Sequence, residues 1–159
     1  MLTVAHFFSW LGDWERVVLI GITFLIVLMY YRQYREAWFL LGVVAIAKLL
    51  SVLLKELFER IRPDMTLWLT DASGFAFPSG HATVAMALYG GLGYLAWRQL
   101  KHLITRYLTL VICFILVVGI GLSRVYLRVH WLTDVLGGWL LGAAVLLFLD
   151  LTVIKRKWG

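Results

Sequence analysis

The chain has 159 residues, of which 62% are hydrophobic and only 15% are charged, and its formal net charge is +6. A typical soluble domain carries about 25% charged residues, so this composition excludes an ordinary soluble domain. The charged residues lie between apolar runs rather than within them, which indicates a membrane protein. The single cysteine, Cys113, excludes an intrachain disulfide.

Five apolar runs have the composition of membrane spans, which need about 17–25 mostly apolar residues. They are Val17–Tyr31, Ala37–Leu57, Ser79–Trp97, Tyr107–Leu122 and Leu132–Ile154. The segment Met1–Asp13 is apolar but too short to span, and we expect it to lie in the membrane interface. No repeat or linker divides the chain, which predicts one domain over residues 1–159. The predicted fold is therefore all-α, an integral-membrane helical bundle of about five transmembrane helices with an interfacial N-terminal segment.

Basic residues that flank the apolar runs predict how the bundle is oriented. One side collects eight cations against the single acid Glu36: Arg32, Arg35, Arg98, Lys101, Arg106, Lys155, Arg156 and Lys157. The other side carries six cations and seven acids. The first side is predicted to be cytoplasmic, with the N-terminus outside and the C-terminus inside. The positive charge is then a consequence of topology, and we expect no nucleic-acid partner.

The first segment with candidate chemistry follows the second run. Lys55 and Arg62 are seven residues apart, so they share one face two turns apart if the helix continues. Two cations there can bind a dianionic phosphate, although a lone pair of this kind often only reaches toward lipid headgroups. Pro63 marks the helix end. Lys48 lies seven residues before Lys55 and either faces the same pocket or pairs with Asp150.

The second segment is Pro78-Ser79-Gly80-His81 at the start of the third run. Ser79 is a favourable helix N-cap, and Gly80 allows a ligand to approach the backbone closely. The free N–H groups of a helix start favour a phosphate oxygen, and His81 in the first turn could donate a proton to a leaving alkoxide. A capped helix with an interfacial histidine is the competing interpretation.

The third segment comprises Ser123-Arg124, His130 and Asp134. His130 and Asp134 are one helical turn apart, so the carboxylate can accept the imidazole N–H, fix its tautomer and leave the other ring nitrogen free. His130 is then a competent nucleophile toward phosphorus, and Arg124 supplies a third cation. An isolated histidine–aspartate pair is usually structural, but here it accompanies two other segments with phosphate-binding chemistry.

Several remaining features have simpler interpretations. We expect the loop Pro63–Phe77 to form a lid or rim in which Asp64 and Asp71 are solvated. Six glycines predict close helix packing: Gly90, Gly91, Gly93, Gly137, Gly138 and Gly142. Three tryptophans, Trp68, Trp131 and Trp139, are expected to pack or to anchor the chain at the interface.

Together, the three segments resemble the signature of the type 2 phosphatidic acid phosphatases, the PAP2 superfamily, in order and in spacing over residues 55–134. The resemblance implies that His130 attacks phosphorus to form a phosphohistidine, that His81 is the general acid and that Asp134 orients His130. It implies phosphate binding by Lys55, Arg62, Ser79, Gly80 and Arg124, and it implies no metal or other cofactor.

The function implied is hydrolysis of a lipid phosphate or diphosphate, such as undecaprenyl diphosphate, phosphatidylglycerol phosphate or phosphatidic acid. It would occur at the outer, periplasmic face of a bacterial cell membrane. Alternatives are a lipid A phosphatase or phosphotransferase of the same family, and a non-catalytic lipid-phosphate binder or transporter, which needs the cations but not both histidines. A vanadium haloperoxidase shares the pocket pattern, but five spans argue against it. Bacterial membrane members resemble six-span proteins, so this chain is either a minimal member or part of a longer protein.

Overall fold

The computed structural model describes residues 1–154, and all regular structure in that range is helical. The helices are α1 (Leu2–Leu11), α2 (Trp14–Tyr30), α3 (Tyr34–Phe58), α4 (Gly80–Ala85), α5 (Gly91–Gln99), α6 (Leu103–Tyr126) and α7 (Leu132–Leu149). A π-helical turn, Met86–Gly90, joins α4 to α5, a second, Asp150–Ile154, extends α7, and a 3₁₀ turn covers Met65–Leu67. The predicted all-α bundle is confirmed. Lys155, Arg156 and Lys157, and the end of the predicted domain, lie outside the described residues.

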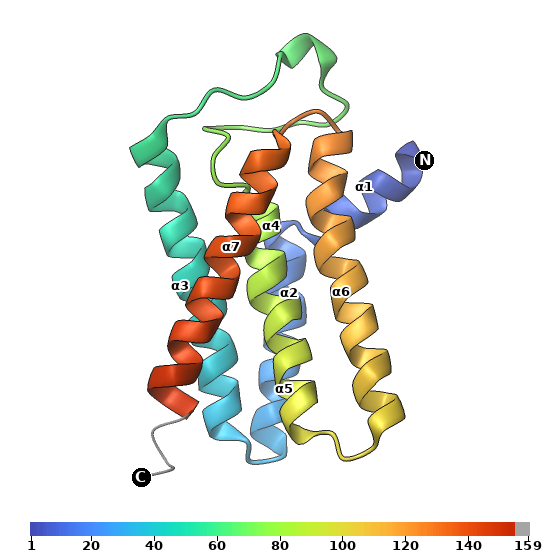
Figure 1. Ribbon diagram of the computed structural model, residues 1–159, viewed down its shortest axis with the longest axis vertical. Helices are drawn as coiled ribbons and strands as arrows, with labels where there is room; N and C mark the ends of the chain where they lie inside the picture. Colours follow the sequence, from blue (N-terminus) through green and yellow to red (C-terminus); the bar gives the residue numbers. More distant parts are fainter. Residues whose placement is uncertain (155–159) are drawn as a thin grey trace.

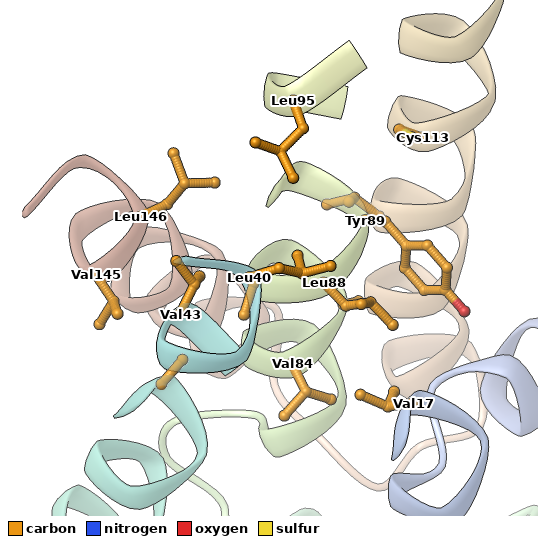
Figure 2. Packing of buried hydrophobic residues seen from close by; sticks show 14 of the residues in the cluster. Val17, Leu40, Val43, Val84, Leu88, Tyr89, Leu95, Cys113, Val145 and Leu146 are labelled. Atoms are coloured by element: carbon orange, nitrogen blue, oxygen red, sulfur yellow. The ribbon is translucent and has the colours of Figure 1, made fainter. Parts of the chain in front are cut away.

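The rod formed by α4, its π turn and α5 stands at the centre of the bundle (Figure 1). α4 contacts α2, α3, α6 and α7, and α5 contacts α3 and α6. The core around this rod is aliphatic, with Leu40, Val84 and Leu88 almost completely buried (Figure 2). The hydroxyl of Tyr89 donates to the carbonyl of Leu11 at 3.1 Å, which attaches the rod to the end of α1.

Three helices are long and apolar enough to cross a membrane by length and composition: α3, α6 and α7 with its extension, Leu132–Thr152. α2 has 17 residues, and the central rod is divided into elements of 6, 5 and 9 residues. All five rods run between the same two ends of the bundle (Figure 1), as the sequence suggested. The total of five spans stays a prediction.

The N-terminal segment is a helix that packs obliquely beside the bundle (Figure 1). α1 lies against α6 and buries Ala5 and Ser9. The chain turns at Gly12, where an added Cβ would stand 2.5 Å from Cγ2 of Ile120 and 3.0 Å from Cδ2 of His81. Only a glycine allows the chain to pass this close to α4 and α6. The predicted interfacial location remains untested.

The ends that carry the three motif segments all meet at one end of the bundle. They are the end of α3, the start of α4, the end of α6 and the start of α7 (Figure 1). The loop after α3 crosses this end and is anchored by backbone bonds from Leu69 N to Leu127 O (3.1 Å) and from Ala76 N to Arg60 O (2.8 Å). The loop thus lies as a rim over the place where the motifs converge.

Close contact between α4 and α7 fixes the start of the central rod. A Cβ added at Gly138 would lie 2.7 Å from the carbonyl oxygen of Ser79 and 2.9 Å from the Cβ of Ala82. The predicted packing role of this glycine is confirmed, and its absence of a side chain lets Ser79 lie against α7. The tryptophans pack as expected, with indole N–H bonds from Trp68 to Pro63 O, from Trp131 to Ile61 O and from Trp139 to Val117 O.

Candidate active site

A cavity of about 300 Å³ lies beneath the loop where the motif segments converge. Its lining residues are Gly12, Trp14, Lys48, Lys55, Arg62, Asp71, Ala72, Ser73, Gly80, His81, Val84, Arg124 and His130. Six of the eight site residues expected from the sequence are in this lining, although they come from three helices, α3, α4 and α6, and from two connections, the loop after α3 and the link between α6 and α7. The other two, Ser79 and Asp134, are buried next to it.

His130 is held in the short connection between α6 and α7 by the first turn of α7. The Oδ2 atom of Asp134 accepts the N–H of Trp131 at 2.9 Å, as in a helix capping box, and lies 3.4 Å from Nδ1 of His130. A proton on Nδ1 is favoured by this carboxylate, which leaves Nε2 as the nitrogen with a free lone pair. One aspartate therefore caps α7 and lies beside the imidazole.

Arg62 lies directly beside that nitrogen. Its Nη1 donates to Nε2 of His130 at 3.1 Å and to the carbonyl of Val129 at 2.8 Å, so the Nε2 lone pair accepts an Arg62 N–H in this structure. Its Nε and Nη2 donate to Gly74 O at 2.8 Å and Ser73 O at 2.7 Å. Three backbone carbonyls thus fix the guanidinium group where it can hold an anion against His130.

The expected helical relation between Lys55 and Arg62 is wrong. α3 ends at Phe58, because Glu59 adopts a left-handed conformation (φ 43°) that terminates the helix. Arg62 is therefore a loop residue, and it reaches the cavity because residues 73–74 bind its side chain. Lys55, in the last turn of α3, donates from Nζ to Phe75 O at 2.5 Å. The two cations meet at the cavity although they share no helix face.

His81 lies in the first turn of α4, where the sequence placed it, and it has a partner that the sequence did not reveal. Its Nε2 is 3.0 Å from Oδ1 of Asp13, at the junction of α1 and α2. Hydrogen bonding from His81 is the main cause that lowers the pKa of Asp13. The two residues are 68 positions apart, so no local spacing could have indicated this pair.

Ser79 occupies the N-cap position of α4, but its side chain makes no capping bond. Its backbone N–H donates instead to the carbonyl of Asp134 at 2.9 Å, which ties the start of α4 to α7. Within residues 1–154, the buried Oγ of Ser79, Nε of Arg124 and Nδ1 of His130 have no hydrogen-bond partner, the last lying 3.4 Å from Asp134. Nη1 of Arg124 donates to Oγ of Ser9 on α1, another contact that the sequence did not predict. Unpartnered buried donors are rare and favour an anion beside them.

Arg60 is a further residue that sequence reasoning missed. Its Nη1 binds both Oδ1 of Asp134 and Oγ1 of Thr133 at 2.7 Å. From the sequence, Arg60 was one of the six cations predicted on the outer side and had no predicted role in the site. The ion pair compensates a carboxylate that is completely buried (0% exposed) and would otherwise be costly to ionise.

The cavity is strongly cationic. Lys48, Lys55, Arg62 and Arg124 line it, whereas Asp71, an exposed loop residue, is the one acid in the lining. Burial lowers the pKa of His130 to about 4, against the opposing effect of Asp134, so this imidazole is neutral at pH 7. A neutral imidazole beside several cations is suited to attack on a bound anion.

The alternative pairing of Lys48 with Asp150 is wrong. Asp150 binds Tyr94 and Arg98 near the other end of the bundle. Lys48 instead lies 5.0 Å from the ring centroid of Trp14, at the cavity. Of the two roles left open by the sequence, only the pocket-facing position agrees with the structure. In the described part of the chain, no three histidine, cysteine or acidic side chains come together to hold a metal ion.

An apolar groove of about 310 Å³ opens between α2 and α3. It is lined by Trp14, Val17, Val18, Gly21, Ile22, Leu25, Leu40, Leu41, Val44 and Ala45. Trp14 lines both this groove and the cationic cavity. An amphiphile with an anionic head and an apolar tail would therefore find both environments side by side.

A family model of the PAP2 superfamily matches residues 36–158. The chain belongs to the PAP2 superfamily. It is 39% identical over 116 residues to phosphatidylglycerophosphatase B of Bacillus subtilis (strain 168), covering 72% of this chain and 57% of that protein. It is also 34% identical over 103 residues, 62% of this chain and 48% of the relative, to YbjG of Escherichia coli (strain K12), provisionally named an undecaprenyl-diphosphatase. The chain thus matches about half the length of both relatives.

Two solved structures have a similar fold. The crystal structure of a transmembrane PAP2 type phosphatidylglycerolphosphate phosphatase from Bacillus subtilis superposes with a TM-score of 0.89 at 32% identity, covering 99% of this chain and 78% of that one. Aquifex aeolicus LpxE superposes with a TM-score of 0.73 at 24% identity, covering 92% and 83%, and shows likeness of fold alone. This PAP2 chain is therefore an all-helical membrane protein.

Proposed function

We propose that this PAP2 protein is an integral-membrane phosphatase that hydrolyses a lipid phosphate or diphosphate through a phosphohistidine on His130. The observation that carries the proposal is the 3.1 Å approach of Arg62 Nη1 to Nε2 of His130 on a cationic cavity. A phosphoryl oxygen that accepts this Arg62 N–H in place of Nε2 frees the nitrogen lone pair and brings phosphorus next to it. The lipid character of the substrate is supported by the apolar groove that shares Trp14 with this cavity.

The proposed reaction has two displacements. Nε2 of His130 forms a bond to phosphorus as the bond to the leaving oxygen breaks, and His81 gives that oxygen a proton. His81 then takes a proton from water, whose oxygen attacks phosphorus and releases His130 and inorganic phosphate. Lys55, Arg62 and Arg124, with the Ser79 and Gly80 segment, hold the phosphoryl oxygens and compensate their charge. Because Asp13 occupies Nε2 of His81, Nδ1 is the nitrogen left for the leaving oxygen.

The names of the relatives suggest phosphatidylglycerol phosphate or undecaprenyl diphosphate as substrates, and phosphatidic acid is a simpler alternative. We place the active site at the outer face of a bacterial cell membrane, because the opposite end of the bundle carries Arg32, Arg35, Arg98, Lys101 and Arg106. Attachment of a membrane-impermeant thiol reagent to Asp71→Cys, but not to Lys101→Cys, in intact cells tests this orientation. Both variants are made in a Cys113→Ala background, so the introduced thiol is the one labelled.

Phosphate release by purified protein, assayed on these three lipids, tests the function. We expect release to continue in excess chelator, to stop with vanadate and to fall by many orders of magnitude in His130→Ala. A ³²P-labelled substrate should leave an acid-labile, base-stable label on wild type that is missing from His130→Ala.

Other outcomes would identify the alternative functions. Tight lipid binding with no release would identify a lipid-phosphate binder, and release abolished by the chelator would identify a metal enzyme. Transfer of the label to an acceptor lipid would identify a phosphotransferase, and lipid A included in the panel tests the remaining alternative.

A further inference from the structure

Lys48 is a cation that the proposed reaction does not use. It lies in the middle of α3, one of the helices long and apolar enough to span a membrane. In the part of the chain that the structure describes, no carboxylate comes within 4.0 Å of its amine. A charge at this depth is costly unless it has a partner or a function. Among the described residues, its amine lies over the face of the Trp14 ring. An aromatic ring stabilises the charge of an ammonium group less than an anion would.

The position of Lys48 in the cavity shows which part of a substrate it would meet. Lys48 precedes Lys55 by seven residues, about 10.5 Å along the helix, and it lies on the side away from the end where Arg62 and His130 meet. The positive charge of Lys48 is close enough to act electrostatically on the side chains of both Lys55 and His81. Trp14, over whose ring the amine lies, also lines the apolar groove. Lys48 thus lines the same cavity as His81 and contacts Trp14, which borders the groove.

A lipid bound for the proposed reaction would extend in the same direction. Its scissile phosphoryl group contacts His130 and Arg62, its leaving oxygen faces His81 and its apolar tail reaches the groove. The part of the leaving group between His81 and the tail then passes Lys48. In a lipid monophosphate this part is a neutral alkyl or glyceryl unit. In a lipid diphosphate it is a second phosphate, and in a phosphatidylglycerol phosphate it carries a phosphodiester.

We propose that Lys48 forms a second anion subsite and selects lipids whose leaving group itself carries a phosphate. This inference rests on the proposed function and specifies the substrate class for the same cavity. When the bond between phosphorus and the leaving oxygen breaks, the proton from His81 goes to that oxygen, and the charge that remains on the leaving phosphate is compensated by Lys48. A phosphatidate or a polyprenyl monophosphate offers Lys48 no such group.

Farnesyl diphosphate and farnesyl monophosphate test the proposal, because they share one tail and differ by one phosphate. Initial rates of phosphate release give kcat/KM for each compound with wild type, Lys48→Met, Lys48→Gln and Lys48→Arg. We expect the ratio of diphosphate to monophosphate kcat/KM to fall about 10- to 100-fold in the Met and Gln variants, the loss of one charge-assisted hydrogen bond. Lys48→Arg keeps the charge and should stay within a few-fold of wild type.

Lys101→Met is the matched control, since it removes an exposed lysine from the other end of the bundle. It should leave the ratio unchanged. An equal fall in both kcat/KM values in Lys48→Met and Lys48→Gln, or no change in the ratio, overturns the subsite. If Lys48→Met does not fold, Lys48→Gln, with its shorter polar side chain, gives the same decision. Failure of wild type to release phosphate from either compound would instead overturn the proposed function.

Discussion

The two histidines of the cavity are each held by an aspartate, but the two surroundings differ in kind. Asp134 is completely buried, with 0% of its side chain exposed; it contacts the Trp131 backbone and His130 in the adjoining chain, and it pairs with the distant Arg60. Asp13 has 47% of its side chain exposed and binds His81 from a different helix junction. His130, the proposed nucleophile, thus lies against a buried carboxylate from the adjoining chain. The position of His81, the proposed general acid, relative to its aspartate depends on where α1 and α2 are docked.

This difference suits the proposed roles. A nucleophile must keep one tautomer and one orientation, which a buried carboxylate with several partners imposes. A group that gives and takes protons must exchange with water, and a half-exposed partner permits that exchange. Four measurements test the comparison, in order of decreasing expected effect.

Replacement of Asp134 by asparagine should be the most damaging of these changes. The amide cannot keep the proton on Nδ1 or stabilise the imidazole as charge develops, so we expect kcat to fall roughly 10³- to 10⁴-fold with little change in KM. Initial rates on a lipid phosphate, together with ³²P trapping, measure the effect. A loss below tenfold with a normal phosphoenzyme level would show that Asp134 serves the fold of α7 and not His130.

Replacement of Asp13 by asparagine should cost less, roughly 10- to 100-fold in kcat, because His81 keeps its place in α4 but loses the partner that orients it. The loss should be large for an alkyl phosphate, whose leaving oxygen needs a proton, and small for p-nitrophenyl phosphate, which does not. Asp64→Asn is the control, since that loop acid bonds only to Thr66. Equal losses on both substrates would assign Asp13 a structural role.

Replacement of Arg60 by methionine separates the ion pair of Asp134 with Arg60 from its 3.4 Å contact with His130. The carboxylate keeps His130 and the Trp131 N–H, so we expect kcat to fall less than about tenfold. The apparent melting temperature in detergent should fall, because a buried charge loses its counter-ion, although Arg60 is itself 39% exposed and the cost is reduced accordingly. Arg128→Met, an exposed arginine at the same end, is the control. A loss as large as that of Asp134→Asn would make Arg60 part of the reaction.

The titration of His130 is expected to show the smallest effect of the four measurements. Because burial lowers its pKa to about 4, the folded protein leaves His130 neutral between pH 4 and 6.5, whereas an unfolded histidine takes up a proton there. The unfolded state then binds more protons, so this residue makes the free energy of unfolding decrease as pH falls from 6.5 to 4. NMR of ¹⁵N-histidine-labelled protein in micelles, assigned with His130→Ala, should show a midpoint near 4. A midpoint near 6.5 would contradict the dry environment described for this pair.

Much of this molecule follows from the sequence alone. Apolar runs broken by short charged segments determine an all-helical membrane bundle, because a chain in a bilayer must satisfy its backbone hydrogen bonds within its own helices. Alternation of the spans then brings the ends at Lys55, His81, Arg124 and His130 to one end of the bundle. The four-residue spacing of His130 and Asp134 predicts their contact, although His130 precedes α7 and meets Asp134 where the first turn of that helix is capped.

Only the tertiary structure decided the contacts between distant segments. Three bonds between distant segments have no periodic signal in the sequence: those of Asp13 to His81, of Arg60 to Asp134 and of Arg124 to Ser9. The number of residues between two partners does not predict how far apart they lie in space, because docking of α1 against α6 and closure of the loop bring them together. The end of α3 before Glu59 likewise had no signal in the sequence. The position of Lys48 was open for the same reason, since helix periodicity gives a face but not the neighbour that the face meets.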